Sequence, residues 1–144
     1  MISVSVSKRS EQVLIDLQHA PRLWEEGVTE ALHDIGQIAS KEARRLIRQG
    51  PKTGRVYVRR GQRHQASAPG QSPAEDTGRL SRSVGYRVRG SRQLAVGAQA
   101  SYAAFLERGT RKMAPRPFIL AAANNTAAQA IGLLGRRVHQ RIAA

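Results

Sequence analysis

The stretch PRLWEEGVTEALHDIGQIASKEARRLIRQGP, residues 21–51, decides the fold of this chain. Its apolar side chains recur at steps of three and four residues, which is the spacing of one face of an α-helix. Pro21 suits the first helical turn, and Gly50 with Pro51 stops the pattern. We therefore predict one long helix that ends near Gln49. Its buried stripe is expected to be Trp24, Val28, Leu32, Ile35, Ile38, Ala39, Leu46 and Ile47.

The residues before this helix predict two short elements. Apolar and hydroxyl side chains alternate in Ile-Ser-Val-Ser-Val at residues 2–6, which is typical of a short half-buried strand. Ser10 can cap a short helix, with Val13, Leu14 and Leu17 on one side. We therefore expect a strand and then a short helix.

The segment after the long helix differs in kind. Residues 50–78 are rich in Gly and Pro and hold few large apolar side chains. The Val-Tyr-Val run at 56–58 followed by Gly61 indicates a small hairpin or an extended arm, and ASAPGQSP at 66–73 indicates a loop. A segment this long without a core is usually functional or disordered. Its basic residues are Lys52, Arg55, Arg59, Arg60 and Arg63.

Two strands and a short helix are expected after Gly78. Residues 80–88 alternate well enough for a strand, and 94–96 supply its partner across a turn at 89–91. Residues 100–108 predict a short helix that Gly109 ends.

The last part of the chain predicts a second long helix. Two prolines keep residues 113–118 extended, and the helix begins at about Phe118. Arg136, Arg137 and Arg141 lie in its last turns, where they complement the helix dipole. Its expected apolar stripe is Leu120, Ala127, Ile131, Leu134, Val138 and Ile142.

These elements together predict an α+β fold. A small antiparallel sheet packs against one long N-terminal helix and one C-terminal helix, with a long extended basic loop between them. The length of 144 residues favours one domain, residues 1–144, with an arm at about 50–78.

The charge of the chain is high and uneven. The formal net charge is +14, from 24 basic and 10 acidic residues. Residues 1–42 hold seven acids and four bases, while residues 43–144 hold three acids and twenty bases. Such a surface attracts nucleic acid or acidic protein, although a solvated basic face is the plainer interpretation. The helical residues Lys41, Arg44, Arg45 and Arg48 could meet phosphates, but no groove-entering motif is present.

Residues that could carry out chemistry do not form a recognisable constellation. No two of the four histidines have metal-ligand spacing, and Ser72 and Ser81 lack a Gly-x-Ser-x-Gly context. Glu75 and Asp76 could bind a metal, but a turn or N-cap role for Asp76 is the better interpretation. The chain has no cysteine, no secretory signal and no apolar run that could span a membrane. We expect no enzyme activity, no metal and no cofactor, in a soluble protein made in a cytoplasm.

Three segments carry a family resemblance. They are ASAPGQSPAEDTGRLSRSV at 66–84, SYAAFLERGT at 101–110 and APRPFILAA at 114–122. In this order the chain resembles the tail-completion, or neck, family of long-tailed phages of the Hong Kong 97 type, over roughly residues 20–143. Motif residues that the resemblance marks as structural are Gly78, Arg79, Leu80, Tyr102, Phe105, Gly109, Thr110, Pro117 and Phe118.

The resemblance implies a structural virion protein that assembles as a ring, commonly a hexamer, at the head–tail junction. Its expected partners are further copies, connector or head-closure proteins, and tail-terminator or tail-tube proteins; non-specific contact with DNA in the lumen is left open. A tail-terminator or head-closure subunit, or a basic nucleic-acid-binding module outside a virion, is the alternative. The expected location is the virion, with assembly in the host cytoplasm. Candidate interface residues are Arg55, Tyr57, Arg59, Arg60, Arg63, Glu107 and Arg116.

Some motif residues also have plain structural interpretations. Gly78 and Gly109 are expected in positive-φ turns, and Tyr102, Phe105 and Phe118 are expected to pack in the core. Glu107 is the one acid after Asp76. We expect it to accept hydrogen bonds from backbone donors, or to pair with an arginine such as Arg79 or Arg116, within or between subunits, and so to fix the approach of the last helix.

Overall fold

A computed structural model describes residues 2–6, 12–17 and 24–143 of the chain. Its main sheet has four antiparallel strands in the order β1-β2-β6-β5. Val13 lies opposite Val96, and Val96 lies opposite Tyr86, which sets the register of three neighbouring strands. The strands are β1 (Ile2–Val6), β2 (Gln12–Leu17), β5 (Val84–Arg89) and β6 (Gln93–Ala98).

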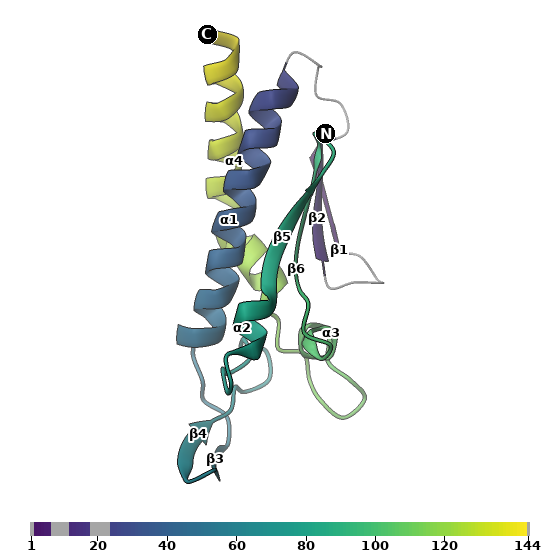
Figure 1. The fold of residues 1–144 in the computed structure, drawn as a ribbon. Coiled ribbons are helices and arrows are strands. Elements are labelled where there is room, and N and C mark those ends of the chain that lie inside the picture. Colours follow the sequence, from purple (N-terminus) through teal and green to yellow (C-terminus); the bar gives the residue numbers. More distant parts are fainter. Residues whose placement is uncertain (1, 7–11, 18–23, 144) are drawn as a thin grey trace.

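Two long helices, α1 (Glu25–Gln49) and α4 (Ile119–Ala143), lie side by side along one face of this sheet (Figure 1). α1 packs over β5 and β6 and buries the stripe predicted for it, apart from Trp24 and Ile38, which are half-buried. It ends at Gly50 as predicted, and the Gly50 N–H donates to the Leu46 carbonyl at 3.0 Å. The α+β prediction is therefore confirmed, with the two helices on the sheet.

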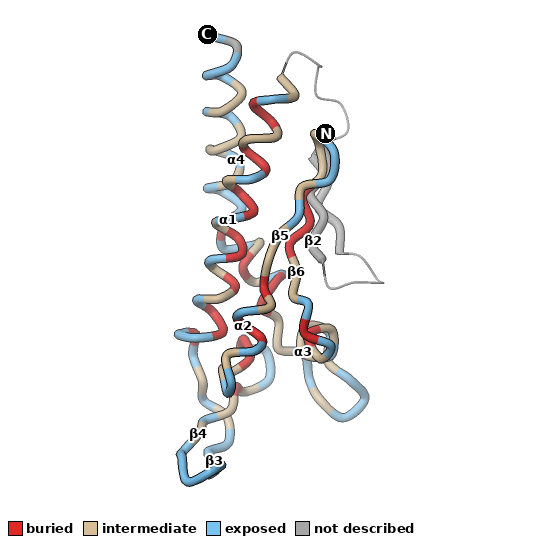
Figure 2. The backbone as a smooth tube through the Cα atoms, in the orientation of Figure 1, coloured by how far each residue is buried: buried red, intermediate tan, exposed pale blue. Residues whose placement is uncertain are grey.

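The core consists of two clusters that share α1. One lies toward the end of α1 and includes Ile47, Leu80, Val84 and Phe118. The other lies toward its start and joins α1 to Leu94 and Val96 of β6, with Trp24 packed against it. Figure 2 shows buried positions along α1 and β6 and exposed ones over the far end of the molecule. Because α1 contributes to both clusters, it is the central element of the fold.

The segment between α1 and β5 contains a hairpin, which is one of the two alternatives that the Val-Tyr-Val run indicated; the long extended loop of the predicted fold is not confirmed. β3 (Val56–Arg59) pairs with β4 (Gln62–Gln65) across a two-residue turn with positive φ at Arg60 and Gly61. This hairpin projects beyond the end of α1 (Figure 1). Two short helices, α2 (Arg79–Ser83) and α3 (Ala103–Arg108), lie at the same end of the molecule.

The short helix predicted after Ser10 is wrong, because residues 12–17 form the strand β2. β2 pairs with β1 on one side and β6 on the other, and this long-range pairing overrides a weak helical spacing. Ser10 and Pro21 themselves lie outside the described residues.

The strand predicted at 80–88 begins later than expected, because residues 79–83 form α2. Two serine hydroxyls donate to nearby backbone carbonyls: Ser81 to Gly78 at 3.2 Å and Ser83 to Leu80 at 2.8 Å. Such local bonds compete with a strand ladder and favour a turn. The partner strand, the turn between the two strands and α3 are found where the sequence placed them.

The stripe predicted for α4 is also wrong in part. Leu120 and Ile131 are 41% and 64% exposed, and Ala127 is exposed too. Leu134 and Val138 pack against the core as expected, and the side chain of Ile142 lies outside the described residues. The face turned to α1 and the sheet mixes four small residues with four larger apolar ones: Ile119, Ala122, Ala123, Thr126, Ala130, Leu133, Leu134 and Val138.

Candidate assembly surface

The hairpin is the most exposed regular element of the described chain. All four residues of β3 are exposed, and Val58 is 71% exposed. Tyr57 stacks on His64 of β4, with ring centroids 5.7 Å apart. Arg55, Arg60 and Arg63 are exposed as well. The hairpin therefore offers solvent an apolar Val-Tyr-Val strand surrounded by positive charge.

The base of the arm is held by the Gln71 side chain. Its carbonyl oxygen accepts from the backbone N–H groups of Thr53 and Ala68, at 3.0 and 2.9 Å, and its amide donates to the Thr53 hydroxyl at 2.9 Å. The Gly54 N–H donates to the Ala66 carbonyl at 2.9 Å. These bonds close the loop at its neck, so the hairpin projects from an ordered base.

Lys52 ties this base to the end of α1. Its ammonium donates to the carbonyls of Leu46, at 3.0 Å, and Ser72, at 2.8 Å. Burial lowers the pKa of Lys52 from its ordinary value. A cation at this position gives the Leu46 carbonyl a second donor beside the Gly50 N–H, and it complements the negative end of the helix dipole.

Glu75 and Asp76 each form an ion pair with an arginine of another element. Asp76 pairs with Arg59 of β3, and Glu75 pairs with Arg48 of α1 at 3.5 Å and accepts from the Ser81 hydroxyl. The N-cap role considered for Asp76 is wrong, because Gly78 occupies the N-cap of α2 and no side chain caps it. Gly78 has the positive φ expected of it, as does Gly109 at the end of α3.

Glu107 caps α4 with both carboxylate oxygens. Oε2 accepts from the N–H groups of Phe118, at 2.9 Å, and Ile119, at 3.1 Å, while Oε1 accepts from Leu120 at 2.8 Å. These are three of the backbone donors that a helix start leaves without partners. The backbone role expected for Glu107 is therefore confirmed.

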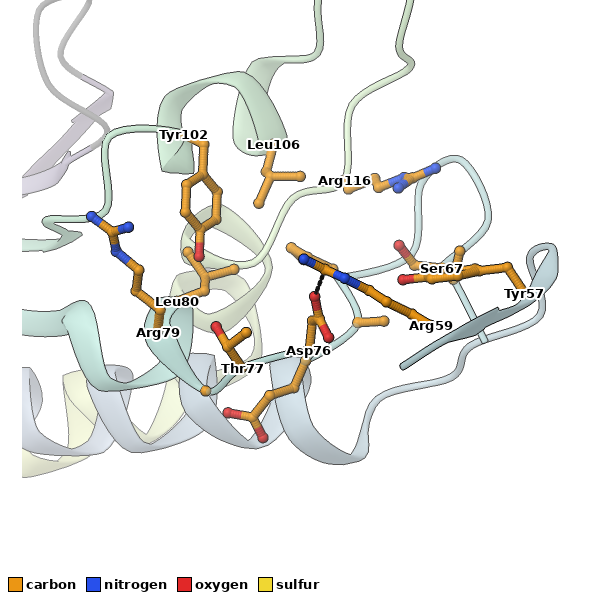
Figure 3. Close-up of a pocket in the computed structure, with 15 residues that line it drawn as sticks. Tyr57, Arg59, Ser67, Asp76, Thr77, Arg79, Leu80, Tyr102, Leu106 and Arg116 are labelled. Carbon is orange, nitrogen blue, oxygen red and sulfur yellow. Dashed lines mark hydrogen bonds and ion pairs between the residues drawn. The ribbon is translucent and has the colours of Figure 1, made fainter. Parts of the chain in front are cut away.

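A cleft of about 390 Å³ opens between the hairpin, the segment 73–80, α3 and the chain entering α4 (Figure 3). Leu80 and Leu106 form apolar walls, and the paired Arg59 and Asp76 cross its floor. The cleft brings together seven of the residues singled out in the sequence. These are Tyr57, Arg59, Gly78, Arg79, Leu80, Tyr102 and Arg116.

Other singled-out residues lie elsewhere. Phe118 is fully buried in the core as predicted, but Phe105 is 58% exposed on α3, so its expected core role is wrong. Arg55, Arg60 and Arg63 lie on the hairpin outside the cleft. Ser67 and Gln71 were not singled out within the loop at 66–73, because polar residues in a loop are common and only the folded backbone shows what each one binds.

An ion-pair cluster joins the start of α1 to the end of α4. Arg137 pairs with Asp34 at 2.8 Å, and Arg141 pairs with Glu26 and Glu30. Glu30 raises the pKa of Arg141 by hydrogen bonding and by its charge. The three acids are four residues apart, so they share one face of α1. In this cluster the two arginine charges are offset by the three acids.

Small size, a basic surface and a projecting hairpin are typical of a protein that works by assembling with other chains. No group of three or more His, Asp or Glu side chains is arranged to hold a metal ion within the described ranges. No helix that the structure describes is long and apolar enough to cross a membrane.

A family model described as "Bacteriophage HK97-gp10, putative tail-component" matches residues 11–109. The match covers more than half of the chain, from β2 to the end of α3, and the chain belongs to this family of phage tail components. A component of a phage tail is part of the virion and contacts other virion proteins. No curated protein and no solved structure matches the chain.

Proposed function

We propose that the chain is a structural, non-enzymatic subunit of a ring at the phage head–tail junction, where it joins the head connector to the tail tube. The ring is a homo-oligomer, most simply a hexamer, and it forms in the host cytoplasm during particle assembly. Membership of the tail-component family supports a virion role, and the hairpin supports assembly through subunit contacts.

The observation that carries the proposal is the exposure of the hairpin. Two-stranded hairpins are marginally stable in water, and this one leaves Val56 and Val58 in solvent. The hairpin contacts the rest of the protein through Asp76, which pairs with Arg59 and lies 4.0 Å from His64 Nδ1, and through the hydrogen bonds at its neck. A neighbouring subunit that covers the Val-Tyr-Val strand buries these apolar side chains and so stabilises the hairpin.

Such a contact is heterologous, because the arm of one subunit meets a different surface of the next. Repeated contacts of this kind form a ring when the rotation from one subunit to the next closes on itself. The side chains of Arg55, Arg60 and Arg63 have no partner among the described residues, so they are free to donate to a neighbour's backbone carbonyls. The proposed interface residues are Arg55, Tyr57, Arg59, Arg60, Arg63, Glu107 and Arg116.

The alternative placements, as a tail-terminator or head-closure ring, use the same subunit contact. Nucleic-acid binding through the α1 cations has less support. Arg44 donates to the Val84 carbonyl, Arg45 pairs with Glu42 at 2.7 Å, and Arg48 pairs with Glu75. Only Lys41 of the four lacks a partner within the described chain, so non-specific contact with DNA in the lumen would fall to other arginines.

Native mass spectrometry and electron microscopy of the full chain test the proposal. We expect rings for the wild type, loss of rings for Val58→Asp, and retention for Val58→Thr, which keeps the β-branched shape. In infections, Val58→Asp should leave full heads and tails unjoined. A wild type that stays monomeric, together with normal particles from the Val58→Asp phage, would overturn the proposal.

A further inference from the structure

We infer that the cleft beneath the hairpin is a docking site for an acidic side chain on an extended segment of another virion protein. The inference names the chemistry of one partner, and in placing that partner in the virion it rests on the proposed function. It starts from two buried donors in the cleft lining that have no partner in the described chain, Ser67 Oγ and Arg116 Nε.

Each of these groups is costly to leave without a partner. Ser67 is 2% exposed, and a buried hydroxyl without a hydrogen bond destabilises the fold. Arg116 is partly buried, and its side chain forms no ion pair among the described residues. A guanidinium is the side chain best suited to bind a carboxylate through two parallel bonds. The donors therefore call for an acceptor with negative charge.

The rest of the lining defines what carries that charge. Arg79 also lacks a partner in the described chain, and the Tyr102 ring lies beside Leu80 and Leu106 (Figure 3). Glu75 and Asp76 lie in the same lining, where they disfavour a dense row of phosphates. One carboxylate flanked by apolar side chains suits such a cleft, because the walls cover the apolar groups and Arg116 binds the acid.

We infer that the occupant is a different protein, because no acidic side chain that the structure describes is free. Every acidic side chain that the structure describes is already bonded within its own chain. The contacts are Glu25–Arg92, Glu26–Arg141, Glu30–Arg141, Asp34–Arg137, Glu42–Arg45, Glu75–Arg48, Asp76–Arg59, and Glu107 with the start of α4.

The test is a nitrogen-15 NMR titration of the full chain that follows the Arg116 Nε–H signal. The probe is the capped peptide Gly-Ser-Leu-Glu-Leu-Ser-Gly, and its control has Gln in place of Glu. We expect the Glu peptide to move the signal to saturation and the Gln peptide to bind about tenfold more weakly. The Arg116→Gln variant should no longer bind the Glu peptide. The control variant Arg87→Gln, which changes an exposed arginine on β5, should bind it as the wild type does.

Three results would overturn the inference. The two peptides could bind with equal affinity, neither peptide could move the Arg116 signal, or a short DNA duplex could saturate that signal at a lower concentration than the Glu peptide. The peptide comparison on the wild type needs no variant, so a folding defect in Arg116→Gln does not obscure it. If the protein forms rings but does not bind the peptide, this inference alone is overturned. If the protein binds the peptide but forms no ring, only the proposed function is overturned.

Discussion

The Glu107 carboxylate shows how one side chain can position a whole helix. It binds three successive N–H groups at the start of α4, and Gln at this position keeps the shape with one acceptor oxygen fewer and no charge. We expect Glu107→Gln to lower the free energy of unfolding by about 1–2 kcal/mol, as the loss of a helix cap does. Urea unfolding measures this change.

The control for that measurement is Glu26→Gln, because the Glu26 side chain is 82% exposed and its pair with Arg141 lies at the surface. We expect a change below about 0.5 kcal/mol for the control. Equal effects of the two substitutions would show that the cap at Glu107 adds nothing beyond an exposed charge.

Two helical glycines give opposite predictions for the same substitution. A Cβ at Gly36 of α1 would overlap the Tyr86 ring, whereas a Cβ at Gly135 of α4 would meet nothing within 4 Å. Gly36→Ala should therefore destabilise the protein by roughly 1–3 kcal/mol through overpacking. Gly135→Ala should stabilise it by about 0.5–1 kcal/mol, since alanine is the better helix former. Thermal unfolding of both variants checks the signs, and a stabilised Gly36→Ala would contradict the close contact of α1 with β5.

The arm is the element whose behaviour differs most along its own length. We predict fast amide exchange for residues 56–65 in an isolated subunit and slower exchange at Gly54 and Ala66, whose N–H groups are bonded at the neck. Protection of the whole arm, residues 50–75, should rise on ring formation. Strong protection of the hairpin in a verified monomer would contradict this.

The neck depends on one amide, so a single substitution tests it. Gln71→Ala removes three hydrogen bonds, and we expect faster exchange at Gly54 and Ala66, by about tenfold for each 1.4 kcal/mol lost. Gln62→Ala, at an exposed position on β4, should leave these amides unchanged. Equal exchange in the two variants would mean that the backbone alone holds the neck.

The elements also show where sequence reasoning succeeds and fails. α1 was predictable because its large apolar residues share one face. α4 was predicted only in part, because it carries Leu120 and Ile131 on an exposed face, while Ala and Thr make up half of its buried face. Small residues let α1 and α4 approach closely, but periodicity alone does not show which of two faces that both carry Leu or Ile is buried. β2 was missed because its partner, β6, lies far away in the chain.

The same contrast holds for the candidate site. The role of Glu107 could be inferred because an isolated acid before Pro-Phe and a helix has few possible partners. The cleft could not, because its lining comes from five separated segments that only the fold brings together. Ser67 gains its importance from burial, which a polar loop sequence does not reveal.

At the scale of the whole molecule, we propose that the chain is one domain. α1 contributes to both core clusters, so neither cluster can unfold while α1 remains folded and packed. We expect a single unfolding transition in which tryptophan fluorescence and circular dichroism coincide. Trp24 is the one tryptophan and packs at the cluster toward the start of α1, so it reports on that end alone. A fluorescence midpoint separate from the dichroism midpoint would divide the chain into two units.

The distribution of charge leads to a prediction for assembly. The acidic side chains that the structure describes are all paired within the chain. Because the net charge is +14, copies that approach one another repel. Ring contacts must then come from the burial of apolar side chains and from backbone hydrogen bonds. The positive charges of the hairpin arginines repel neighbouring copies and so weaken these contacts. Salt screens this repulsion, because the Debye length falls from about 10 Å at 0.1 M to about 3 Å at 1 M. We therefore expect self-association to strengthen as salt is raised.

Sedimentation of the full chain over a series of sodium chloride concentrations measures this dependence. The double variant Arg60→Gln, Arg63→Gln removes two exposed charges from the hairpin, and it should associate more readily at low salt and respond less to added salt. Binding of the acidic peptide to the cleft should weaken over the same series, because opposite charges attract there. The two contacts of one subunit would thus respond to salt with opposite signs. Self-association that weakens with salt would instead show that ion pairs between copies hold the ring, which requires acids outside those the structure describes.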